Sequence, residues 1–147
     1  MKFKLIIDPG REEEVVVTAH TANELTAKLE EMVLRYDGKD KLPAYTEDAM
    51  RMLPFAQMEC ITVQDGKTLV IDAKGQTYRL RMRLYEVEAV LPSYFIRINK
   101  SALANEKRLE RFVATYSGGV DAVFKCGYRE YVSRRCFAEI RKRYEGK

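Results

Sequence analysis

Basic side chains gather at three points of the chain where the residue pattern predicts a turn or the start of a helix. Lys67-Thr68 follows the turn signal Asp65-Gly66, which lies between two strand-like segments. The segment 97–101 (Arg-Ile-Asn-Lys-Ser) alternates, so its first, third and fifth side chains share one face. Ser133-Arg134-Arg135 places two arginines directly after a serine of the kind that caps helices. Cations in such positions attract anions, so these segments predict contacts with a polyanion.

The pair Arg134-Arg135 is the most informative of the three, because its position opposes the usual charge preference of a helix. A helix N-terminus carries partial positive charge, and a cation in the first turn is unfavourable by roughly a few tenths of a kcal/mol. An anion bound by the free N–H groups and the guanidinium groups together would remove this penalty. Arginine also has the paired donors that match O6 and N7 of guanine. The alternative is that both arginines simply point to solvent.

The residues that catalysis requires are scarce, and we expect no enzyme. The chain has no G-x-S-x-G, H-E-x-x-H or P-loop pattern. Its single histidine, His20, has no obvious partner for acid–base chemistry. Three cysteines without a C-x-x-C pair favour neither a disulfide scaffold nor a zinc site. We therefore expect no catalytic residues, metal, cofactor or small-molecule substrate.

Charge is unevenly distributed along the 147 residues. Residues 1–56 have 8 Lys and Arg against 11 Asp and Glu, a net charge of −3, whereas residues 57–147 have 18 against 11, a net charge of +7. Hydrophobic residues make up 46% of the chain, which is enough for a core, and no apolar run has the length of a membrane span. Asp8 and Pro9 interrupt the first apolar segment, so no signal peptide is predicted. We expect a cytoplasmic protein whose acidic third and basic remainder have different roles.

The periodicity of the apolar residues predicts an α+β protein that is mainly β. Residues 3–7 alternate and residues 15–18 are mostly β-branched, so both predict short strands. The capping-box spacing over 21–24 then begins a helix that Gly38 ends. This β-β-α extension covers residues 1–43, with 37–43 as the connecting segment. Residues 44–147 show many short strands separated by turn signals, with a short helix before Pro92 and a final helix after Ser133.

Two segments resemble the signatures of LytTR-type DNA-binding domains. Residues 95–105 (Phe-Ile-Arg-Ile-Asn-Lys-Ser-Ala-Leu-Ala-Asn) are similar to the family pattern F-x-R-[IC]-[HN]-[RKN]-S-x-[IVL]-[VA]-N. About thirty residues later, Tyr131–Phe137 is similar to the second signature, [IV]-x-V-S-R-R-[YN], with Cys136 in place of the usual Tyr or Asn. Two ordered signatures at this separation indicate a member of the family, over roughly residues 52–144.

The resemblance implies a compact, mainly β domain of bacterial transcription regulators. In this family loops, rather than a recognition helix, enter the major grooves of double-stranded DNA. The resemblance places near the bases Lys67 or Thr68, then Asn99 and Lys100, then Arg135. It places near phosphates, or in support of the loops, Arg97, Ser101, Asn105, Ser133 and Arg134.

Residues 1–43 distinguish the chain from the regulators of this family that carry a receiver domain of roughly 120 residues. We expect a regulator without its own receiver domain, which binds DNA as a homodimer on paired half-sites. The acidic segment would pack on the domain, dimerise or bind a controlling partner, and the strand 3–7 is a candidate for pairing with a second copy. Two alternatives stay open, a protein–protein module that regulates a membrane partner and an RNA-binding protein. A redox role for Cys126 or Cys136 is also open.

Overall fold

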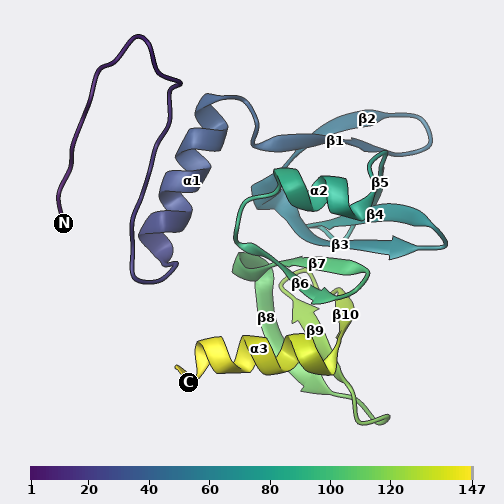
Figure 1. Cartoon of the computed structure of the whole chain (residues 1–147). Coiled ribbons are helices and arrows are strands. Elements are labelled where there is room, and N and C mark those ends of the chain that lie inside the picture. Colours follow the sequence, from purple (N-terminus) through teal and green to yellow (C-terminus); the bar gives the residue numbers. More distant parts are fainter. Residues whose placement is uncertain (147) are drawn as a thin grey trace.

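The computed structural model describes residues 1–146, in which an N-terminal segment precedes two packed sheets (Figure 1). Residues 1–23 form an irregular, exposed segment, which we call the N-terminal arm, and helix α1 (Glu24–Tyr36) follows it. From Lys41 onward the chain forms strands, interrupted by helix α2 (Leu84–Val90) and closed by helix α3 (Arg134–Tyr144). The protein is therefore α+β and mainly β, as the apolar periodicity predicts.

Seven antiparallel strands form the larger sheet, in the order β2-β1-β5-β4-β3-β7-β6. Its strands are β1 (Lys41–Tyr45), β2 (Met50–Pro54), β3 (Met58–Gln64), β4 (Lys67–Asp72), β5 (Thr77–Leu80), β6 (Phe95–Asn99) and β7 (Ala102–Asn105). The smaller sheet has the order β10-β9-β8, with β8 (Leu109–Ala114), β9 (Val120–Phe124) and β10 (Arg129–Val132). Short 3-10 turns, Phe55–Gln57 and Glu106–Arg108, precede β3 and β8.

A left-handed turn fixes the register of the central hairpin. Asp65 has φ 53° and Gly66 has φ 73°, and two successive positive φ values are what a two-residue hairpin turn with the twist of a sheet requires. The turn joins β3 to β4 and sets Gln64 opposite Lys67. The hairpin predicted from Asp65-Gly66 is thereby confirmed.

The two faces of the larger sheet contribute to separate buried clusters. One face packs with α2 in a first cluster that includes Ile61, Val70 and Val87. At β3, β7 and β6 the other face packs against the smaller sheet and α3, in a second cluster that includes Ile98, Phe124, Val132 and Ile140. Because the second cluster takes residues from β6, β10 and α3, it holds the ends of these elements close together.

The N-terminal segment differs from the prediction in its strands. Residues 3–7 and 15–18 form no strands; both segments are irregular and exposed. A two-stranded hairpin is at best marginally stable in water unless a further strand or a helix covers its apolar face. No element within residues 24–146 provides that cover, so the arm forms no sheet in the single chain despite its alternating pattern.

Helix α1 is present as predicted, but its first cap is two residues later than expected. The side chain of Asn23 accepts a hydrogen bond from the N–H of Thr26 at 3.0 Å, and the N–H of Asn23 donates to Oγ1 of Thr26 at 2.9 Å. Two donors at the helix N-terminus are satisfied by this reciprocal pair. Asn23 therefore replaces Thr21 as the N-cap.

The connection between α1 and the sheet is shorter than residues 37–43, because β1 already begins at Lys41. Pro43 lies inside β1, where proline lacks a donor for a strand ladder. The strand tolerates it because β1 pairs with β5 at one residue pair only, Tyr45 and Arg79, which leaves that edge open beside Pro43.

Candidate nucleic-acid interface

The β3–β4 hairpin presents Lys67 and buries Thr68. Lys67 is exposed beside the turn, whereas Thr68 is 7% exposed and lies between Val63 on β3 and Leu80 on β5. Neighbouring side chains of a strand point to opposite faces, which explains the difference. Of the two residues predicted at this loop, Lys67 is therefore the accessible one.

The turn between β6 and β7 exposes Lys100 and is held from two sides. The guanidinium of Arg97 donates to the carbonyl of Lys100 at 2.7 Å and forms an ion pair with Glu88 of α2 at 2.9 Å. Asn99 is 8% exposed, and its side-chain oxygen accepts a hydrogen bond from the N–H of Ser101 at 2.7 Å. Arg97 and Asn99 therefore brace the turn, and Lys100 is the cation that the turn presents.

Helix α3 begins with positive charge that no acid of its first turn balances. Ser133 is the N-cap, and its Oγ accepts a hydrogen bond from the N–H of Cys136 at 3.2 Å. Arg134 and Arg135 follow and are exposed, and the first turn has no acidic residue. The ion pairs of α3 in the described chain lie at its other end. The unfavourable interaction of two arginines with the helix dipole is thus real in the folded protein.

Backbone hydrogen bonds join these three segments to one another. The N–H of Val63, near the end of β3, donates to the carbonyl of Ser101 at 2.9 Å. The N–H of Ser133 donates to the carbonyl of Ile98, near the end of β6, at 2.8 Å. The segment before α3, the β6–β7 turn and the β3–β4 hairpin therefore lie side by side.

We call the resulting surface the basic edge and define it by its exposed cations, Lys67, Lys100, Arg134 and Arg135. In Figure 1 the β3–β4 turn, the β6–β7 turn and the start of α3 all lie on the right of the molecule, away from α1. Residues separated by more than sixty positions in the sequence thus lie on one surface.

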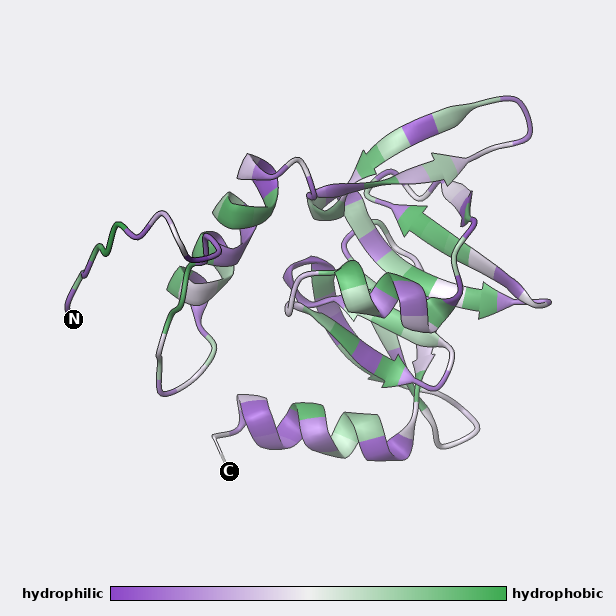
Figure 2. Cartoon of the chain, turned by 45° about the horizontal axis from the view of Figure 1, so that its top comes forward, coloured by the Kyte–Doolittle hydropathy of each residue, from purple (hydrophilic) through white to green (hydrophobic). Residues whose placement is uncertain are grey.

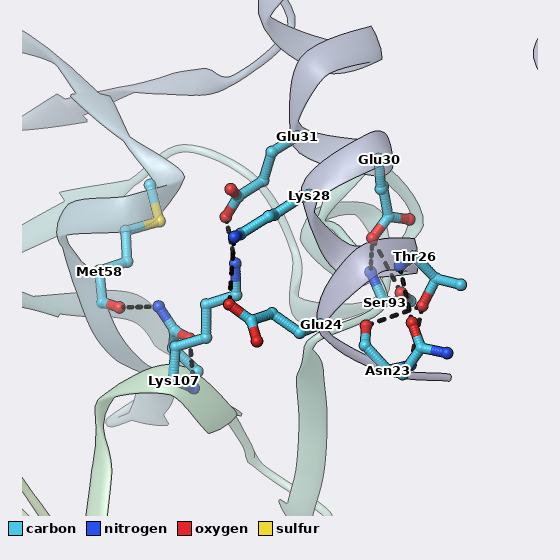
Figure 3. A network of polar contacts seen from close by, with 10 residues as sticks. Asn23, Glu24, Thr26, Lys28, Glu30, Glu31, Met58, Ser93 and Lys107 are labelled. Atoms are coloured by element: carbon cyan, nitrogen blue, oxygen red, sulfur yellow. Dashed lines mark hydrogen bonds and ion pairs between the residues drawn. The ribbon is translucent and has the colours of Figure 1, made fainter. Parts of the chain in front are cut away.

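Asn105 does not lie at this edge. It ends β7 at the opposite end from the β6–β7 turn and is 1% exposed. Its side-chain N–H donates to the carbonyl of Met58 at 2.9 Å, and its side-chain oxygen accepts from the N–H of Lys107 at 3.0 Å. Figure 3 labels these two partners. Asn105 therefore fixes the start of β3 and the 3-10 turn before β8, which agrees with a supporting role and separates it from the exposed cations.

The sequence predicts a turn at Ser117-Gly118-Gly119, but not that this β8–β9 turn lies next to the basic edge. Val120 of β9 pairs with both Ala114 of β8 and Val132 of β10, so the turn lies at the end of the small sheet from which α3 begins. Tyr116 is fully exposed at this turn. Only the pairing of β9 with β10 places this turn and the start of α3 at the same end of the small sheet, and no local sequence pattern predicts that pairing.

Cys60 and Cys126 are poor candidates for redox chemistry. Burial raises the pKa of the Cys126 thiol, and its contacts with Glu59 raise it further. Burial also raises the pKa of Cys60, which is completely inaccessible. The thiolate is the reactive form, so both shifts lower reactivity near neutral pH.

Residues 1–146 contain no group of three or more His, Cys, Asp or Glu side chains able to hold a metal ion. No helix within that range is both long and apolar enough to cross a membrane.

Comparison with protein families gives a match to the LytTr DNA-binding domain over residues 48–145. HTH-type transcriptional regulators of Staphylococcus aureus, from strains bovine RF122 / ET3-1 and NCTC 8325 / PS 47, are 28% identical over 145 residues, covering 97% of this chain and 97% of each relative. Among solved structures, a LytTr DNA-binding domain from Bacillus cereus matches with a TM-score of 0.63 and 24% identity, covering 70% of this chain and 94% of that one.

The relatives are named for a helix-turn-helix, yet this chain shows no such unit in its described part. Strands separate α1 from α2 and α2 from α3, so no two helices are consecutive. A recognition helix held by a preceding helix is therefore absent from residues 1–146, and the exposed cations lie at two hairpin turns and in the first turn of α3 instead.

Proposed function

The chain belongs to the LytTR family of DNA-binding domains, and on that premise we propose that it regulates transcription by binding a defined sequence of double-stranded DNA through the basic edge. The family is one of DNA-binding domains and not of enzymes. The names of the full-length relatives support the regulatory role, and their matched length includes the N-terminal segment. Such a regulator acts in the bacterial cytoplasm, where the chromosome lies.

One observation carries the proposal. Four exposed cations from three distant segments share one edge, and hydrogen bonds within the protein hold their loops. Isolated surface lysines and arginines occur on any soluble protein and need no partner. A helix start with two arginines beside two loop-tip lysines is a costly arrangement unless a polyanion binds there.

In this proposal the exposed cations of the basic edge contact the DNA, and less exposed residues beneath them hold the loops in place. We assign base contacts to Lys67, Lys100 and Arg135, which stand at loop tips or in the first turn of α3. Arg134 and the N–H groups at the start of α3 contact phosphates. Asn99, Thr68 and Ser133 hold the loops from inside, so their effect on DNA binding is indirect.

In this proposal, two copies of the chain bind two half-sites in successive major grooves. A duplex offers the two-fold symmetry that pairs of identical subunits match, and half-sites recur about every 10–10.5 base pairs. Residues 1–40 form the arm, one helix and a short connection, which is unlike a receiver domain, so we propose no phosphorylation control through this segment.

The test begins with selection of genomic fragments by the full chain, followed by footprinting to define the half-site. Fluorescence anisotropy then compares wild type with Arg135→Ala on the cognate duplex and on an unrelated duplex. We expect a cost of about 1–3 kcal/mol on the cognate duplex and a smaller one on the unrelated duplex. Log affinity should fall steeply with log salt, with a slope near −0.9 per neutralised phosphate.

Arg141→Ala is the matched control, because Arg141 lies on the same helix beyond the basic edge and pairs with Glu145. Its cognate affinity should stay within about twofold of wild type. Equal losses on both duplexes for Arg135→Ala would show that Arg135 does not read bases. Equal binding to single strands and duplexes would argue against the function itself.

A further inference from the structure

Helix α1 is attached to the domain by its polar side. The carboxylate of Glu30 accepts hydrogen bonds from the N–H and the hydroxyl of Ser93 at 2.9 and 2.8 Å, and Glu31 forms an ion pair with Lys107 (Figure 3). Leu34, on the same side, packs against the first core cluster. These contacts fix which side of α1 faces the sheets.

The opposite side of α1 is apolar and uncovered. Residues spaced three and four apart form an outward stripe, which we call the apolar stripe: Leu25, Leu29, Met32, Val33 and Tyr36. Four of the five are exposed, with Met32 at 62% and Tyr36 at 89%. A surface helix normally buries its apolar side and exposes its polar side, and α1 does the reverse. The helix is therefore arranged for a second apolar surface.

The N-terminal arm adds apolar residues next to this stripe. Phe3, Leu5, Ile6, Ile7 and Val15–Val17 are all exposed, with Phe3 at 91%. Figures 1 and 2 show the arm on the same side of the molecule as α1, and Figure 2 colours long stretches of it as hydrophobic. Both elements lie away from the basic edge. A partner bound to the arm and the apolar stripe therefore leaves the cations of the basic edge free.

The sequence of the arm complements itself in an antiparallel pair. If residues 3–7 of two copies pair about Leu5, Phe3 of one copy lies opposite Ile7 of the other, and Lys2 lies opposite Asp8. One side of the pair is then wholly apolar, and each end carries an opposite-charge pair. A two-fold interface requires this self-complementarity, which an unrelated partner does not.

The exposed area matches that of a stable dimer. Besides Met1, eleven large apolar side chains of the arm and the stripe are between 37% and 91% exposed. Their burial would remove on the order of 500–900 Å² of apolar surface per copy. A standard protein interface buries about 800 Å² per partner, so one further copy of the chain is sufficient cover.

We infer that residues 1–36 are the dimerisation element, in which the apolar stripe of α1 and the arm of one copy pack against those of a second copy. The strands predicted over 3–7 and 15–18 form on this association, because the second copy supplies the edge and the apolar layer that the single chain lacks. This inference rests on the proposed binding of two copies to paired half-sites, for which it names the interface.

Sedimentation velocity of the full chain over a concentration series tests the inference. Wild type should be a dimer, and Met32→Glu or Leu5→Lys should raise the dimer dissociation constant at least about tenfold, since each places two like charges in a closed apolar interface. Tyr85→Glu is the matched control, because Tyr85 is an equally exposed aromatic residue on α2, at 66%. It should leave the dissociation constant unchanged.

A charge exchange within the arm is the sharper test. Lys2→Glu should weaken the dimer by opposing two acids, and Lys2→Glu combined with Asp8→Lys should restore it. A wild-type chain that is monomeric throughout, or a Met32→Glu variant as dimeric as wild type, would overturn the inference. Affinity for a duplex with a single half-site should be equal in wild type and Met32→Glu. If neither protein binds this duplex, the proposed DNA binding fails, whereas sedimentation alone decides whether the dimer interface is correct.

Discussion

Asn99 donates its side-chain amide to the backbone carbonyl of Tyr131 at 2.6 Å, and this bond ties the β6–β7 turn to the strand that leads into α3. The other end of the same side chain accepts from Ser101 within the turn. One buried amide thus sets the position of Lys100 relative to Arg134 and Arg135.

Asn99→Ala should weaken DNA binding although Asn99 itself is buried. Loss of the amide leaves the carbonyl of Tyr131 and the N–H of Ser101 without partners, at a cost of about 1–3 kcal/mol in stability. The loops that carry the cations then lose their fixed spacing. Urea unfolding measures the first effect and anisotropy the second. Asn105→Ala is the control: it should destabilise to a similar degree while the folded protein keeps its DNA affinity, because Asn105 lies away from the basic edge.

Gly66→Ala should destabilise the β3–β4 hairpin through backbone strain alone. A Cβ added at Gly66 meets no atom within 4 Å, but φ of 73° is a conformation that residues with side chains rarely adopt. The expected cost is about 1–2 kcal/mol, measured by thermal or urea unfolding. Gly66→Asn should cost less, since asparagine tolerates positive φ better than alanine. Equal stability of wild type and Gly66→Ala would show that the turn relaxes to another type.

The buried carboxylate of Glu59 should make Arg108 a stability residue. Glu59 is completely buried, pairs with Arg108 and accepts a hydrogen bond from the N–H of Cys126 at 2.9 Å. Arg108→Met leaves this charge unpaired and should cost about 3–5 kcal/mol in unfolding free energy. The double variant Arg108→Met/Glu59→Gln should recover part of that loss. Arg111→Met, an exposed arginine on the next strand, should cost less than about 1 kcal/mol.

Thiol reactivity should follow the raised pKa of Cys126. A raised pKa means that the thiolate is scarce at neutral pH, and that its fraction still increases above pH 9, the ordinary pKa of the thiol. Alkylation of the folded protein by iodoacetamide, resolved by peptide mass, should therefore accelerate at Cys126 beyond that pH, whereas buried Cys60 stays unmodified until the protein unfolds. A rate at Cys126 that levels off below pH 9 contradicts the shift.

Local rules predicted those parts of the structure that depend on neighbouring residues. Asp65-Gly66 specifies its hairpin because the required φ values belong to those two residues, and Ser133 caps α3 through a bond three residues away. The accessibility of Asn99 was not predictable in this way. Its partner Tyr131 lies 32 residues along the chain, so only the packing of the two sheets shows that the amide is buried.

In the N-terminal arm, the local pattern predicts a strand that the single chain does not form. Its alternating residues 3–7 favour a strand, but a strand requires a partner edge, and no local pattern tells whether that edge belongs to the same chain. The helix that follows needed no such partner, because Asn23 and Thr26 satisfy its first donors and Glu30 attaches it to Ser93.

The bonds that join the basic edge also determine the thermodynamics of any ligand that docks there. Val63 donates its N–H to Ser101 in the turn between β6 and β7, and Ser133 donates its N–H to Ile98 near the end of β6, so the loops lose their conformational entropy when the domain folds. Because the edge is already rigid, it loses little further conformational entropy on association, and this favours affinity without any additional contact. The amide protons of Val63 and Ser133 should exchange with solvent only when the domain opens, at rates typical of a core and unlike those of surface loops.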